Sequence, residues 1–123
     1  MSRKRVLIVS AGVEAVHAVR RAQEMGFDVL VSDRDPSAPG FAIAGDGLLA
    51  STYDANGTAG AAEEFVRKKG PIHGVLTVAA DVPLTVATVA HRLGLPGIPM
   101  EAARLAQDKL AMKVRFAEAG IPV

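Results

Sequence analysis

The turn Ser10-Ala11-Gly12 is the first stretch of this sequence whose residue types could bind a ligand. It follows an unbroken apolar run at residues 6–9 and precedes a helical pattern that opens at Val13. A glycine at position 12 would let the backbone approach a phosphate, and the free amides at the start of a helix bind anions. The turn is therefore a candidate phosphate-binding turn.

The same turn half-matches the G-x-G-x-x-G/A pattern of dinucleotide-binding domains. Gly12 and Ala15 fit that pattern, whereas Ser10 replaces its first glycine. Asp33 lies roughly 20 residues after Gly12, where NAD-binding domains place the acid that binds the ribose. Such half-matches are common in βαβ units. The alternative that Gly12 only permits a tight turn and Asp33 only begins a loop stays open.

Three other acidic or small residues stand where strands are expected to end. Ala80 and Asp81 follow the apolar segment 74–79, at the carboxyl edge of the expected sheet. Asp81 could contact a substrate there, cap the next helix, or do both. Glu14 would lie in the first turn of a helix, where a carboxylate complements the helix dipole; this structural role is its alternative.

Metal-binding and catalytic patterns are weak in this sequence. The three histidines, His17, His73 and His91, fall on separate expected elements and have no ligand spacing, and the chain has no cysteine. A structural or solvated role is the simpler interpretation of each histidine. We assign no catalytic residue and no metal ligand to this chain.

Hydropathy patterns define the elements that would position these residues. The expected strands span residues 5–9, 27–32, 46–51 and 74–79, and the expected helices span residues 13–25, 58–69 and 82–93. A helical turn at 41–44, an extended piece at 95–99 and helices at 101–106 and 109–119 complete the pattern. Alternating strands and helices predict an α/β fold, a doubly wound and mostly parallel Rossmann-like sheet, with C-terminal helices.

Composition limits the classes of protein to which the chain could belong. Its 123 residues suit one domain, and its net charge of +1 gives no reason to expect nucleic acid or an anionic membrane as a partner. No apolar run approaches the ~18 residues of a membrane span. The basic start is followed by too short an apolar run for a signal peptide. A cytoplasmic location is the default expectation.

The C-terminal third carries the most specific motifs. These are Leu93-Gly94-Leu95-Pro96-Gly97-Ile98-Pro99, then Gln107-Asp108-Lys109, then Ala119-Gly120-Ile121-Pro122-Val123. Together they resemble the ATP-grasp ligase superfamily, which includes biotin carboxylase, the carbamoyl phosphate synthetase large subunit and ligases of purine and dipeptide synthesis. The resemblance implies a pre-ATP-grasp domain at residues 1–99 and linker helices at 100–123.

The resemblance also implies roles for individual residues. Lys109 matches the family lysine that approaches the nucleotide phosphates. Contacts with the non-nucleotide substrate are implied at Ser10, Ala11, Gly12, Val13, Glu14, Asp33, Ala80 and Asp81. The implied cofactors are ATP and Mg, with the metal ligands expected outside this chain.

The function that we expect is that of the N-terminal substrate-binding domain of an ATP-dependent ligase. The parent enzyme would phosphorylate a small carboxylate and transfer the acyl group to an amine or similar nucleophile. The apolar ending Ile121-Pro122-Val123 favours a longer parent protein, so no turnover is expected from this chain alone. Two alternatives stay open: a free-standing NAD- or nucleotide-binding module, and a non-catalytic interaction domain, for which a homodimer would be supporting evidence.

Overall fold

The computed structural model describes residues 3–78, 80–96 and 119–120. Its centre is a parallel sheet of four strands in the order β3-β2-β1-β4. The strands are β1 (Arg5–Val9), β2 (Asp28–Asp33), β3 (Asp46–Leu49) and β4 (Gly74–Leu76). Strand β1 pairs with β2 on one side and with β4 on the other. The apolar run that opens the chain is thus a central strand, as its sequence predicts.

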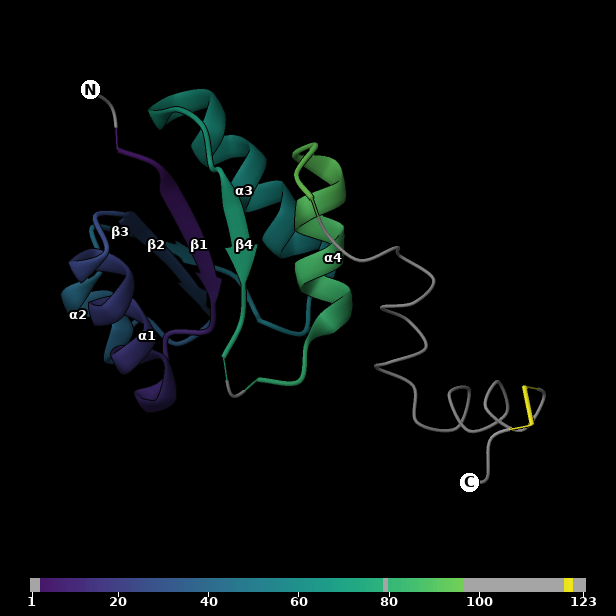
Figure 1. Cartoon of the computed structure of the whole chain (residues 1–123), viewed down its shortest axis with the longest axis horizontal. Helices are drawn as coiled ribbons and strands as arrows, with labels where there is room; N and C mark the ends of the chain where they lie inside the picture. The colour runs from purple at the N-terminus through teal and green to yellow at the C-terminus, as the bar shows by residue number, and fades with distance from the viewer. Residues whose placement is uncertain (1–2, 79, 97–118, 121–123) are drawn as a thin grey trace.

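Helices cover both faces of this sheet (Figure 1). They are α1 (Val13–Glu24), α2 (Gly40–Ile43), α3 (Ala55–Lys69) and α4 (Pro83–Arg92). Helices α1 and α2 lie on one face, and α3 and α4 lie on the other (Figure 1). The predicted doubly wound α/β fold is confirmed.

Strand β1 supplies side chains to both halves of the core. Leu7 and Val9 point to the face covered by α3 and α4, while Ile8 points to the face covered by α1. All three are almost fully buried. Burying a side chain of this size contributes about 2 kcal/mol, so β1 anchors the two layers and fixes where its carboxyl end lies.

The first βα unit ends as the sequence predicts. Gly26 has a φ of +93°, a conformation that glycine adopts without strain. The amide of Gly26 donates to the Gln23 carbonyl, and the amide of Phe27 donates to the Ala22 carbonyl. These two bonds form a Schellman motif that stops α1 and starts the chain toward β2.

Several predicted boundaries are wrong by a few residues. Strands β3 and β4 end at Leu49 and Leu76 rather than at residues 51 and 79. Helix α3 begins at Ala55 rather than at 58, because the Asp54 carboxylate accepts the Gly57 amide at 2.9 Å and caps the helix there. Helix α1 ends at Glu24, one residue before the predicted end.

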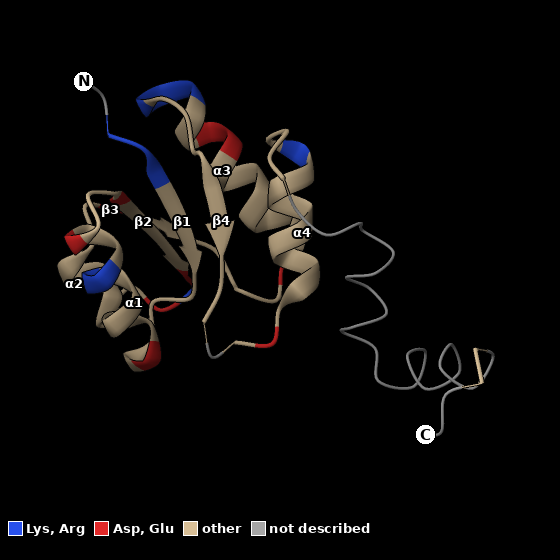
Figure 2. Ribbon diagram, viewed as in Figure 1, with Lys and Arg blue, Asp and Glu red and all other residues tan. Residues whose placement is uncertain are grey.

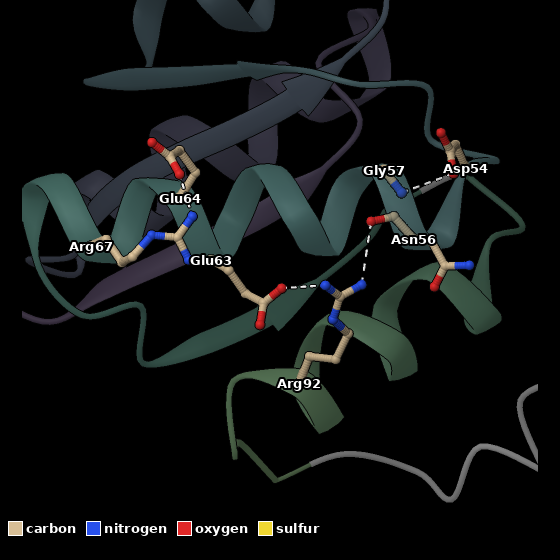
Figure 3. A network of polar contacts seen from close by, with 7 residues as sticks. All are labelled: Asp54, Asn56, Gly57, Glu63, Glu64, Arg67 and Arg92. Carbon is tan, nitrogen blue, oxygen red and sulfur yellow. Dashed lines mark hydrogen bonds and ion pairs between the residues drawn. The ribbon is translucent and has the colours of Figure 1, made fainter.

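Helices α3 and α4 are joined by a polar network centred on Arg92 (Figure 3). The Arg92 guanidinium pairs with Glu63 and also donates to the Asn56 carbonyl at 3.4 Å. The sequence predicts an ion pair between Glu63 and Arg67, and that prediction is wrong, since Arg67 pairs with Glu64. The predicted pair between Glu64 and Lys68 is confirmed at 3.1 Å.

The C-terminal predictions lie mainly outside the described residues. They include the extended piece from residue 97 onward, the helices at 101–106 and 109–119, Lys109 and the boundary at 99/100. Within the described parts of the chain, no helix has the length and hydropathy needed to span a membrane.

Ser32 gives a stability prediction. Its hydroxyl is fully buried on β2 and makes no hydrogen bond within the described part of the protein. A buried polar group without a partner destabilises a fold, so Ser32→Ala should raise the free energy of unfolding by about 1 kcal/mol. Urea unfolding followed by circular dichroism measures the change.

Thr77→Val is the matched comparison for Ser32→Ala. The Thr77 hydroxyl donates to the Val9 carbonyl at 2.7 Å, so its removal should lower stability by about 1 kcal/mol. A loss of stability in both variants would contradict the assignment of Ser32 as unpartnered.

Candidate functional site

The candidate site lies at the carboxyl edge of the sheet. The strands are parallel, so the segments that leave β1, β2, β3 and β4 all begin at this edge (Figure 1). In open α/β sheets, ligands bind in the crevice outside the carboxyl ends of the strands. The structure therefore brings the turn at residues 10–14 and Asp33 to one edge, and Ala80 and Asp81 follow β4 at the same edge.

Ser10 leaves β1 in a strained conformation. Its φ is +121°, and it is the one non-glycine residue of the described chain with a positive φ. Its amide donates to the Ser32 carbonyl at 2.9 Å, and its hydroxyl lies 3.4 Å from the Gly12 amide. The serine thus occupies a backbone position suited to glycine. This agrees with the G-x-G-x-x-G/A pattern, whose first glycine Ser10 replaces. Such strain costs of order 1–3 kcal/mol and is often stored at functional sites.

Asp33 fixes the turn from the neighbouring strand. One oxygen of its carboxylate accepts the Ala11 amide at 3.1 Å, and the other accepts the Asp35 amide at 3.2 Å. The neighbouring carboxylate, that of Asp35, accepts hydrogen bonds from the hydroxyl and the amide of Ser37. These bonds lower the pKa of Asp35. Asp33 therefore has a positioning role in the structure, whatever ligand it contacts.

Gly40 packs directly on the same turn. Its amide donates to the Ala11 carbonyl at 2.7 Å, and a Cβ atom at this position would lie 2.9 Å from both the Cα and the carbonyl oxygen of Ala11. Those are backbone atoms, so they have little freedom to move aside. The role of Gly40 is not predicted from the sequence, because no local pattern signals a close approach between segments so far apart in the chain.

The segment after β4 lies on the other side of β1. Ala80 is half-buried and packs against the core, whereas Asp81 is exposed. The predicted capping role of Asp81 is wrong, because Val82 rather than Asp81 occupies the N-cap of α4. Asp81 follows a parallel neighbour of β1, which is compatible with the predicted substrate contact without testing it.

The exposed side chains of this edge define what a ligand would meet. Val13 is 74% exposed and Tyr53 is 76% exposed, so both offer apolar surface to a ligand. Glu14 is also exposed, and acidic ribbon segments mark the start of α1 and the approach to α4 (Figure 2). Helix α1 adds its first amides, which have no acceptor inside the helix. The edge therefore offers amides for an anionic group and carboxylates for an amine or hydroxyl.

Three hollows are found on the described surface at some distance from this edge, two along the amino ends of the strands and one between β3 and α3. Among the described residues, no cluster of three or more His, Asp or Glu side chains could hold a metal ion.

The strain at Ser10 gives a second stability prediction. Ser10→Gly should raise the free energy of unfolding by about 1 kcal/mol, because relief of the strained φ exceeds the entropy that glycine adds to the unfolded chain. Ser51→Gly is the matched control, since the Ser51 hydroxyl also accepts an amide two residues later, that of Tyr53 at 3.3 Å. The control has an ordinary φ and should lose stability; urea unfolding compares the two. If Ser10→Gly and Ser51→Gly lowered the free energy of unfolding equally, Ser10 would not be strained.

Comparison with known proteins finds solved structures with a similar fold, but no family model or curated protein with a similar sequence. No family model and no curated protein matches the sequence. Among solved structures, phosphoribosylglycinamide synthetase from Anaerococcus prevotii matches 95% of this chain with a TM-score of 0.78 and 24% identity. L-amino acid ligase from Bacillus licheniformis matches 100% of the chain with a TM-score of 0.77 and 17% identity.

A third structure, N5-carboxyaminoimidazole synthetase from Staphylococcus aureus complexed with ADP, matches 95% of the chain with a TM-score of 0.68 and 19% identity. The chain has the fold found in these synthetases and ligases. It covers 29%, 32% and 30% of their respective lengths, so it spans about a third of each. The fold implied by the resemblance to ATP-grasp ligases is thereby confirmed; the roles of individual residues stay predictions.

Proposed function

We propose that this chain is the substrate-binding domain of an ATP-dependent ligase that activates a small carboxylate as an acyl phosphate and joins it to an amine. The observation that carries the proposal is the fold match over almost the whole chain to three enzymes whose names are all synthetase or ligase. The chain covers about a third of each. The motifs at 93–99, 107–109 and 119–123 support the same class of enzyme from the sequence.

The carboxyl edge is the proposed place for the non-nucleotide substrate. The first amides of α1, at Val13 and Glu14, would bind a carboxylate or phosphate, assisted by the positive end of the helix dipole. The exposed carboxylates of Glu14 and Asp81 would accept hydrogen bonds from an amine or hydroxyl. Ser10, Ala11, Gly12 and Asp33 would hold the turn in the conformation that presents those amides, and Ala80 would position the segment that carries Asp81.

The nucleotide site is proposed to lie largely beyond the described residues. One of the matched structures contains ADP, which supports ATP as the nucleotide. Lys109 is proposed to approach its phosphates, where a positive charge stabilises the charge that develops during phosphoryl transfer. The Mg ligands are proposed to belong to a further domain, as the resemblance to ATP-grasp ligases implies.

The test is an activity comparison between this chain and a form extended by the reading frame that follows Val123 in its gene. We expect the extended protein to release ADP only when a suitable carboxylate and amine are both supplied, and the 123-residue chain to release none. A panel of amino acids and ribosylamine phosphates would find the substrate class. ATP hydrolysis by the 123-residue chain, or an extension without an ATP-binding domain, would overturn the proposal.

The alternative of an NAD-binding module stays open. It would use the Asp33 carboxylate for the ribose, and each oxygen of that carboxylate accepts one backbone amide and keeps acceptor capacity for a hydroxyl. Calorimetric titration with NAD distinguishes the two functions, because micromolar binding would favour the module over the ligase domain.

A further inference from the structure

The amino edge of the sheet, opposite the candidate site, carries a concentrated positive charge. A hollow of about 470 Å³ there is lined by the cationic side chains of Arg3, Lys4, Arg5 and Lys69, against the single carboxylate of Asp28. A second hollow of about 470 Å³ adjoins it and shares Arg3, Arg5 and Asp28. Figure 2 shows the basic start of β1 and the basic end of α3 at this edge. We call the first hollow the amino-edge hollow.

Neutral groups contact two of these cations, Arg3 and Arg5, and of the two only Arg3 also pairs with a carboxylate in the described part of the chain. The Arg3 Nε atom donates to the Gly26 carbonyl at 3.0 Å. The Arg5 guanidinium donates to the Pro71 carbonyl at 3.1 Å and lies 4.9 Å from the centroid of the Phe65 ring. A carbonyl and an aromatic face orient a guanidinium without cancelling its charge. The two arginines are therefore pre-organised and still able to attract an anion.

The carboxylates at this edge neutralise only part of the charge. Asp28 lies 3.7 Å from Arg3, and both side chains are about half exposed, so their pairing is weak. Asp46, which lines the adjoining hollow, accepts Lys69 at 2.8 Å. No carboxylate in the described part of the chain pairs with Lys4 or Arg5. An excess of positive charge remains in the amino-edge hollow.

Helix dipoles do not explain this charge. Cations in the last turn of a helix stabilise its negative end, and this accounts for Lys69 at the end of α3. Arg3, Lys4 and Arg5 lie on and before β1 and are in no helix. Three consecutive cations at the start of a central strand repel one another, so a bound anion would stabilise this arrangement.

We propose that the amino-edge hollow binds a small polyvalent oxyanion, either a phosphate ester or a polycarboxylate. Guanidinium groups bind such anions through paired charge-assisted hydrogen bonds, and Lys4 supplies a further charge. The His73 ring lines the same hollow, and its Nδ1 atom accepts the Arg5 amide at 3.0 Å. Its Nε2 atom consequently carries the proton and adds a neutral donor. The site lies at the other end of the strands from the candidate substrate site, so it would be a separate effector site.

The test is a titration of the 123-residue chain with pyrophosphate and, separately, with citrate at low ionic strength, followed by amide chemical shifts and calorimetry. We expect saturable binding of at least one anion, with shifts at Arg3, Arg5 and His73. Tighter binding of pyrophosphate would indicate a phosphate ester, and tighter binding of citrate would indicate a polycarboxylate. Shifts confined to Val13 and Glu14 would overturn the proposal.

Two variants of equal charge change make the titration specific. The double variant Arg3→Gln, Lys4→Gln should weaken binding at least about tenfold, whereas the double variant Arg20→Gln, Arg34→Gln should leave it unchanged. Circular dichroism and thermal unfolding confirm that both variants fold. Equal weakening in both, or no saturable binding by the unmodified chain, would show only non-specific attraction and would overturn the site.

Discussion

Replacing Gly40 by alanine is expected to lower the free energy of unfolding by about 2 to 3 kcal/mol. The new Cβ would lie 2.9 Å from two backbone atoms of Ala11, well inside van der Waals contact. Overpacking of this kind costs about 1–3 kcal/mol, and here the clash falls on backbone rather than on a flexible side chain. The change would also stretch the 2.7 Å bond from the Gly40 amide to the Ala11 carbonyl. Urea unfolding measures the loss.

Gly60→Ala is the control for this clash. Gly60 lies inside α3, and a Cβ there meets nothing within 4 Å. Alanine is favoured over glycine in a helix by about 1 kcal/mol, so this variant should gain stability. Similar effects of the two substitutions would show that the close approach of Gly40 to the turn is not present in solution.

Replacing Asp33 by alanine is expected to lower the free energy of unfolding by about 2 kcal/mol. Two backbone amides, those of Ala11 and Asp35, would lose a charged acceptor. Hydrogen bonds to charged groups contribute about 1.5–3 kcal/mol, and partial exposure at this site reduces the figure. Asp33→Asn keeps one acceptor oxygen and should lose roughly half as much. Urea unfolding of both variants gives the comparison.

Asp35→Ala serves as the control for Asp33. The Asp35 carboxylate accepts the hydroxyl and amide of Ser37 within its own exposed loop, so the loss of stability should be clearly smaller. If the two alanine variants lost stability equally, the bond from Asp33 to the turn would be unimportant, and the turn would have to be held by Gly40 and β1 alone.

Local sequence patterns predicted the parts of this fold that local physics decides. An apolar run on both faces requires cover on both sides, so residues 5–9 indicated a central parallel strand. Gly26 indicated a helix end, and the structure gives it the positive φ of a Schellman motif. The pairing of Glu64 with Lys68, one helical turn apart, follows from spacing alone.

Contacts between distant segments were not predictable in this way. Helical spacing predicts an ion pair between Glu63 and Arg67, but Glu63 forms its ion pair with Arg92 on another helix. Asp81 has the residue type of a cap, yet the chain turns into α4 one residue later, at Val82. In the site, Ser10 was recognised as a departure from glycine, whereas its strain and the approach of Gly40 depend on the folded arrangement of three segments.

We propose that the turn at the start of α1 binds the non-nucleotide substrate of a ligase. Kinetics of the extended enzyme with Glu14→Gln test this claim most directly, with Glu24→Gln at the far end of the same helix as the control. We predict that Glu14→Gln raises the KM for the carboxylate or amine substrate about tenfold, leaves the KM for ATP unchanged, and that the control changes neither. An unchanged substrate KM, or a rise confined to the KM for ATP, would contradict the claim.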